Sequence, residues 1–196
     1  ISSTKTQAVN LNTSADSGSI VYKRAINAVS NPDEFDINMM VLPGVIHGTH
    51  TGTTNHAIDK AEDRADTFLI LDASLYADSV DTVRDNVKTL DSNYTATYCP
   101  WVKILDDSTN RPTWVPPSVV LPGVIAFNDE VAHEWFAPAG LNRGGLTDVL
   151  EAKTRLTHSE RDKLYEDRVN PIATFPGQGV VVFGQKTLQG KPSALD

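Results

Sequence analysis

An uninterrupted apolar run, F-L-I-L-D-A from Phe68 to Ala73, constrains the fold more than any other feature of this sequence. A strand with one face in water alternates apolar and polar residues, and this run does not. It predicts a strand covered on both faces, as in a parallel sheet. Strand and helix patterns then alternate along the chain. Together they predict an α/β fold with a mixed, largely parallel sheet, flanked by helices and with an antiparallel edge.

Two helix starts carry strong local signals. Ser79 is a typical N-cap for a helix that reaches Leu90, because the valines between them repeat at helical spacing. Thr157 and Glu160 form the T-x-x-E pattern of a capping box, which opens a polar helix through Tyr165.

The other elements have weaker patterns. They are a helix from Ser19 to Val29, a strand from Phe35 closed by Pro43-Gly44, a helix over Ala57 to Ala65, a helix capped by Ser118 through Phe127, and strands over residues 170–175 and 179–184.

Prolines limit where one predicted strand can lie. The segment from Tyr94 to Leu105 is interrupted by Pro100 and followed by the turn-rich D-D-S-T-N-R-P and by T-W-V-P. Because proline has no amide donor, we expect a hairpin at a sheet edge and no central strand here. The pentapeptide L-P-G-V-I occurs at Leu42 and again at Leu121. We interpret this as coincidence or as two similar turns from strand to helix.

Composition excludes several classes of protein. The chain has 196 residues, 40% of them apolar, and a formal net charge of −8, which disfavours a general nucleic-acid binder. No apolar run approaches the eighteen or so residues that cross a bilayer. The single cysteine, Cys99, permits neither an internal disulfide nor a cysteine-based zinc cluster, and its position before a proline favours a buried structural thiol.

Three histidines form the best candidate for a chemical site. His47, His50 and His56 lie in H-G-T-H-T-G-T-T-N-H and offer three imidazoles to a zinc ion. The alternative is a polar loop that caps the following helix through Thr53 or Asn55, and the spacing favours this second interpretation because it does not match a helical H-E-x-x-H. A metal-dependent hydrolase that uses this loop stays the alternative function.

Other catalytic patterns are incomplete. Asp72 ends a buried strand and His133 follows in the second half, but Ser118 in P-P-S has the surroundings of a helix cap and lacks a G-x-S-x-G turn. The glycines of G-Q-G-V-V-V-F-G precede a strand, so they indicate a tight turn and no dinucleotide loop. We therefore predict no catalytic, cofactor-binding or metal-ligating residue.

The two ends suggest a fragment. Ser and Thr make up eight of the first nineteen residues, which predicts that residues 1–18 are a flexible linker or the remnant of a preceding domain. The chain stops at K-P-S-A-L-D with no closing element after a strand-like run. We expect one α/β core domain over residues 19–196.

Long motifs in the second half resemble the contractile tail sheath proteins of T-even-like bacteriophages. The similar segments are W-V-P-P-S-V-V-L-P-G-V-I-A-F-N-D, W-F-A-P-A-G-L-N-R-G-G-L, S-E-R-D-K-L-Y-E-D-R-V-N-P-I and F-P-G-Q-G-V-V-V-F-G-Q-K-T-L. Upstream, F-D-I-N-M-M-V-L-P-G-V resembles the start of the same domain. The resemblance implies a three-layer core, subtilisin-like in shape without its catalytic residues, with outer domains and a terminal assembly domain that this chain lacks.

The resemblance also implies a function. It points to a structural subunit of a virion that polymerises with its copies around a tail tube above a baseplate, and contracts to drive the tube through the host envelope. No enzyme activity, cofactor, nucleic acid or membrane is implied, and assembly takes place in the host cytoplasm. A related bacteriocin or secretion sheath stays an alternative. We expect this fragment alone to be monomeric.

Overall fold

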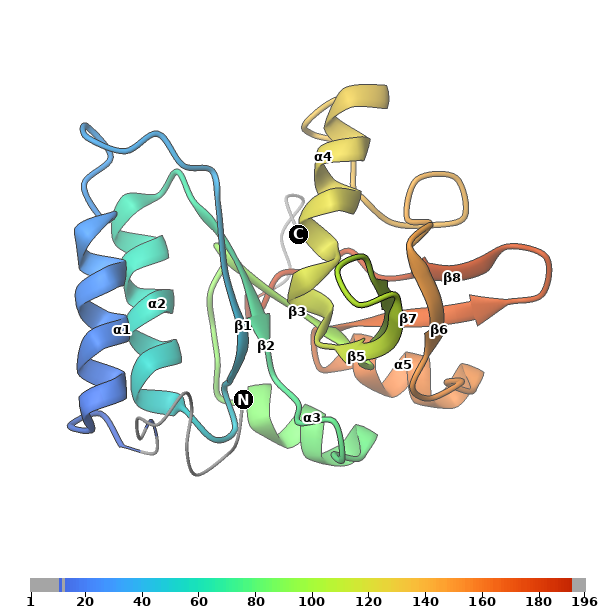
Figure 1. Ribbon diagram of the computed structural model, residues 1–196, viewed down its shortest axis with the longest axis horizontal. Helices are drawn as coiled ribbons and strands as arrows, with labels where there is room; N and C mark the ends of the chain where they lie inside the picture. The colour runs from blue at the N-terminus through green and yellow to red at the C-terminus, as the bar shows by residue number, and fades with distance from the viewer. Residues whose placement is uncertain (1–10, 12, 192–196) are drawn as a thin grey trace.

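The computed structural model describes residue 11 and residues 13–191, and its centre is a five-stranded sheet (Figure 1). The first four strands of the spatial order are parallel and the last is antiparallel, which confirms the α/β class and the mixed sheet with an antiparallel edge. In spatial order the strands are β1 (Met39–Ile46), β2 (Phe68–Asp72), β3 (Thr95–Cys99), β7 (Val169–Phe175) and β8 (Gly179–Val182).

Each face of this sheet contacts its own hydrophobic cluster. From β2, Leu69 and Leu71 enter one cluster while Ile70 enters the other, which is the two-sided burial that the apolar run predicts. The first cluster is completed by helices, with α1 packed outside α2 (Figure 1). These helices are α1 (Ser17–Ala28), α2 (Thr51–Arg64), α3 (Val80–Val87) and α5 (His158–Glu166).

The second face is covered by a segment inserted between β3 and β7. This segment contains a small antiparallel sheet of order β5-β4-β6, and its helix α4 supplies Leu121 and Val124 to the second cluster. The result is three layers, with the large sheet in the middle (Figure 1). The inserted elements are β4 (Val102–Asp106), β5 (Arg111–Val115), the 3₁₀ helix η1 (Pro117–Val119), α4 (Leu121–Val131) and β6 (Val149–Ala152).

The prediction about prolines was half right. The hairpin exists as β4 and β5, and β5 is an edge strand that pairs only with β4. The first half of the segment, however, is β3, which pairs with β2 and β7 and lies at the centre of the large sheet. Pro100 follows the last residue of β3, so it ends a central strand without interrupting its ladder.

Several boundaries differ from the sequence prediction. The first helix begins at Ser17, and Leu11 is only 2% exposed, so part of the predicted linker is packed. The remainder, residues 1–10 and 12, lies outside the described residues. The first strand begins at Met39 and continues through Pro43 to Ile46, and β6 was not predicted.

Among the described residues, no helix has both the length and the hydropathy needed to cross a bilayer.

Both strong helix starts are confirmed. Ser79 accepts a hydrogen bond from the amide of Thr82. The capping box is complete: the amide of Glu160 donates to Thr157 Oγ1 at 3.3 Å, and the Thr157 amide donates to the Glu160 carboxylate at 2.8 Å. Each bond satisfies a backbone donor that a helix end would leave unpaired.

Replacing Thr157 by alanine is expected to lower the free energy of unfolding by about 1 kcal/mol, because one half of the capping box is lost. Urea denaturation followed by circular dichroism measures this change. Ser159→Ala is the control, since Ser159 is exposed in the same helical turn and should change the stability by less than about 0.5 kcal/mol. Equal effects of the two substitutions would contradict a role for the cap.

Candidate functional site

The three histidines of the candidate metal loop take three separate partners. His50 Nδ1 accepts the amide of Ile46 at 3.0 Å, and His47 Nδ1 lies 2.8 Å from Thr54 Oγ1. His56 Nε2 lies 2.8 Å from Asn27 Oδ1 on α1. Within residues 11 and 13–191, no group of three His, Cys, Asp or Glu side chains is arranged to hold a metal ion. The geometry therefore gives the metal-hydrolase alternative no support.

Two of these histidines belong to the interior. His47 and His50 are 5% and 0% exposed, and burial lowers the pKa of both, so they are neutral at pH 7. The predicted caps were wrong, because α2 begins at Thr51 and both Thr53 and Asn55 lie inside it. His50 takes the N-cap position instead and binds backwards to the end of β1.

Asp72 and Ser118 form a buried polar contact between two distant segments. The Ser118 hydroxyl donates to Asp72 Oδ2 at 2.7 Å, and the amides of Ser118 and Gly44 donate to the same carboxyl group at 3.2 and 3.3 Å. Ser118 lies in η1, and α4 begins only at Leu121. The prediction that Ser118 caps this helix was therefore wrong. Burial raises the pKa of Asp72 to about 6, although these three hydrogen bonds oppose the shift.

Asp72, His133 and Ser118 do not form a hydrolase triad in the structure. His133 follows α4, is exposed and stacks on Trp135, with ring centroids 5.4 Å apart. The hydrogen bonds to the Asp72 carboxyl group come from Ser118 and Gly44 and not from His133. Cys99 is buried, which confirms the structural thiol, and burial raises its pKa to about 12. A thiol with so high a pKa is a poor nucleophile.

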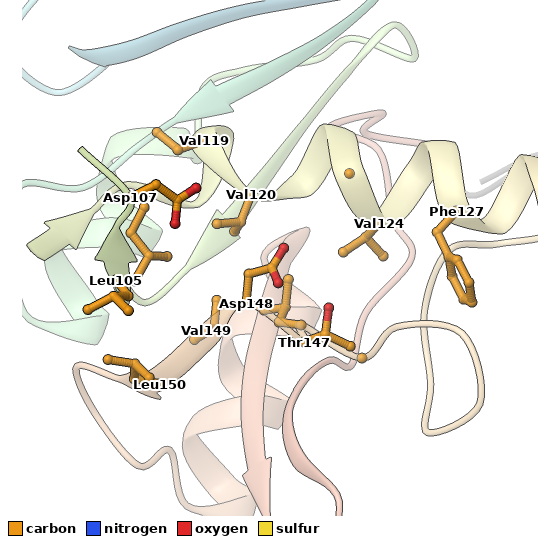
Figure 2. Close-up of a pocket in the computed structure, with 14 residues that line it drawn as sticks. Leu105, Asp107, Val119, Val120, Val124, Phe127, Thr147, Asp148, Val149 and Leu150 are labelled. Carbon is orange, nitrogen blue, oxygen red and sulfur yellow. The ribbon is translucent and has the colours of Figure 1, made fainter. Parts of the chain in front are cut away.

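The surface feature that stands out is a groove beside α4, which we call the α4 groove. Figure 2 shows its apolar wall of α4 side chains opposite residues of β4, β6 and the loop before β6. Its volume is about 760 Å³. It is lined by Leu105, Asp107, Val120, Val124, Phe127, Asp148 and Leu150 among others. An apolar groove that is open to the surface marks a candidate contact surface.

Comparison with known proteins places the chain in a family. The model of the phage tail sheath protein central domain matches residues 18–188, which is most of the chain. The buried histidines and the Asp72–Ser118 contact hold elements of the three-layer core together, which agrees with a structural domain. The chain belongs to the phage tail sheath family, which confirms the resemblance found in the sequence motifs.

Curated relatives support the same assignment. The tail sheath protein of Vibrio phage KVP40 is 36% identical over 107 residues, which cover 55% of this chain and 15% of the relative. The tail sheath protein of Enterobacteria phage T4 is 31% identical over 124 residues, which cover 63% of this chain and 18% of the relative. The chain therefore spans less than a fifth of the length of either relative.

Solved structures share the fold. The helical sheath of the anti-feeding prophage in its contracted state aligns with a TM-score of 0.61 at 23% identity, over 94% of this chain and 47% of that one. The sheath complex of an extracellular contractile injection system, also contracted, aligns with a TM-score of 0.65 at 21% identity, over 85% of this chain and 45% of that one. These likenesses confirm the three-layer α/β architecture.

Proposed function

We propose that residues 19–196 are the core domain of a structural subunit of a phage tail. In this proposal the subunit polymerises with copies of itself around the tail tube, above a baseplate, and contracts to drive the tube through the host envelope. The observation that carries the proposal is the sheath-family match over residues 18–188. The identity of more than 30% to two phage tail sheath proteins favours a phage tail over a bacteriocin or secretion sheath.

Energy for contraction would come from the assembled lattice. The sequence contains no G-K-[ST] phosphate loop, so we propose that two packings of the same subunits differ in free energy and that contraction relaxes one into the other. Isothermal titration calorimetry with ATP and Mg²⁺ tests this part. No binding is expected, and micromolar affinity would contradict it.

Assembly with a tube tests the main proposal. The protein would be produced together with a tail tube protein from the same genome, and the particles would be examined by cryo-electron microscopy. We expect tubes covered by a helical layer that contains this domain. Naked tubes beside monodisperse full-length protein would overturn the proposed function.

The 196-residue chain itself is expected to be monomeric at micromolar concentration. The outer edge of β8 is occupied, because the amide of Leu146 donates to Val180 and the amide of Val182 donates to Gly144. The edge strand β5 contains Pro112, which cannot donate to a neighbouring strand. Light scattering coupled to size exclusion measures the mass, and negative-stain microscopy detects rings or tubes. Ordered rings or tubes would show that the prediction is wrong.

A further inference from the structure

Helix α4 is apolar on nearly every side but only partly covered. Its sequence, L-P-G-V-I-A-F-N-D-E-V, keeps its charged residues in the last turn. Leu121, Val124 and Asn128 form the buried side, while Phe127 and Val131 are 50% and 54% exposed. A helix that is apolar all round is normally buried, so the open side of α4 has the composition of a contact surface.

The α4 groove runs along this open side and carries only negative charge. Asp107 and Asp148 are its charged lining residues, and neither forms an ion pair with any other residue that the structure describes. Figure 2 shows both carboxylates among apolar side chains, with Leu105 and Leu150 nearby. A segment with an apolar face and one or two basic groups would match both properties.

The outer face of α1 is such a segment. Five residues of α1 at spacings of one, three and four positions, which place them on one side of a helix, are exposed: Ile20, Val21, Arg24, Ala25 and Ala28. Helix α1 contains no acidic residue, and Arg24 forms no ion pair within the described part of the chain. Val21 is 59% exposed. This face combines apolar side chains with positive charge, the complement of the α4 groove.

The two surfaces lie in different halves of the molecule. In Figure 1, α1 forms one end of the long axis, and the α4 groove lies in the other half, beyond the large sheet. They therefore cannot satisfy each other within one copy. A contact between two different surfaces of identical chains is heterologous, and repeating it builds a ring or an open helical array.

We propose that the outer face of α1 in one copy docks in the α4 groove of a second copy, with Arg24 facing Asp107 and Asp148. This inference rests on the proposed function, because it supplies one of the contacts of the polymer. A helix laid into an apolar groove is a common mode of recognition. A contact limited to one helix face and one groove is compatible with a monomer at micromolar concentration, because it would be reinforced when many copies are held together.

Disulfide trapping in the 196-residue chain tests the contact directly. One variant carries Ala25→Cys on α1, and the other carries Gly123→Cys in the groove, where an added Cβ would meet no atom within 4 Å. The native Cys99 is buried and does not compete. The two variants are mixed at high concentration under mild oxidation. We expect the mixed dimer to form about tenfold faster than the dimer of Ala25→Cys with Lys163→Cys, an exposed position on α5.

Charge reversal supplies the second arm. Arg24→Glu in the first variant, or Asp148→Lys in the second, should slow the trapping by about tenfold, and combining the two reversals should restore it. Equal rates for the groove and α5 positions would overturn the docking, as would reversals that have no effect. The assay requires no tube, so its failure rejects this contact alone, whereas naked tubes in the assembly experiment reject the proposed function.

Discussion

Replacing Arg64 by alanine is expected to lower the free energy of unfolding by about 3–5 kcal/mol, although the sequence places this residue among the charges at the end of an amphipathic helix. Its side chain is only 1% exposed. The guanidinium donates to the carbonyls of Val29 at 2.7 Å and Phe35 at 2.9 Å, and to both oxygens of Asp66. Alanine would remove a buried side chain and leave the carbonyls of Val29 and Phe35 without this donor, whereas the exposed carboxylate of Asp66 would be hydrated.

The Arg64 contacts explain why so large an effect is expected from one residue. They join the end of α2 to the segment that follows α1 and to the loop before β1. No pairing of strands holds these parts of the chain together. The same guanidinium lowers the pKa of Asp66, chiefly through their hydrogen bond. A planar group with several donors is needed, so Arg64→Lys should recover only part of the lost stability.

Chemical denaturation of the variants measures the effect. Lys60→Ala is the matched control on the same helix, because Lys60 pairs with Asp63 at 2.6 Å on the surface and such pairs contribute less than about 1 kcal/mol. If Arg64→Ala cost no more than Lys60→Ala, the buried network would be irrelevant to stability.

Replacing Asp72 by asparagine is expected to have an effect that depends on pH. Burial raises the pKa of Asp72 from 3.8 to about 6 in the folded protein. The folded state therefore binds a proton that the unfolded state releases between these values, and stability falls as the pH rises through this interval. A shift of about two pKa units corresponds to about 3 kcal/mol.

The wild type should therefore lose about 3 kcal/mol relative to Asp72→Asn between pH 3 and pH 8, the window that contains both pKa values. His47 and His50 act in the opposite direction, since their lowered pKa values make the folded protein less stable as the pH falls below 6.5. They are present in both proteins, so the difference between the two isolates Asp72. Urea titrations at several pH values measure it.

The control for this experiment is Asp33→Asn. Asp33 is exposed, so this variant measures what the same substitution does at the surface. A difference between Asp72→Asn and the wild type that does not change with pH would contradict the assigned protonation of the buried carboxyl group.

Local sequence predicted the elements whose signals are local. The capping box at Thr157, the N-cap at Ser79 and the two-sided burial of Phe68–Asp72 are all confirmed, because each depends on neighbours a few residues away. Family membership was also predictable, since long exact motifs carry more information than any periodicity.

The pentapeptide L-P-G-V-I shows where local information ends. At Leu42 it lies in β1, with Gly44 at φ 79°, and at Leu121 it opens α4. The same five residues thus adopt strand and helix, and the interpretation as two similar turns was wrong. The surroundings decide, because the first copy lies in β1, where Ile46 pairs with Asp72 of β2, and the second packs its leucine and valine into the second cluster.

Buried polar contacts were missed for a related reason. Asn170 is 0% exposed, and its side chain both donates to and accepts from the backbone of Lys186. Ser118 was predicted as a cap but bonds to Asp72, 46 positions away. Such partners are neighbours only in the folded chain, so no spacing in the sequence reveals them. The α4 groove was missed for the same reason, since its walls come from α4, β4 and β6.

The position of β3 has a consequence for the order of folding. Thr97 pairs on one side with Leu71 and on the other with Val169, so the second partner is synthesised only after the whole inserted segment. Until then, the nascent chain contains β1, β2 and β3, and the edge of β3 that will pair with β7 has no partner strand. Pairing across so many residues closes a long loop and slows folding. The inserted segment, which carries the α4 groove, must therefore fold back before the large sheet can be completed, and a ribosome-bound chain that ends before β7 should still be open to proteases at β3.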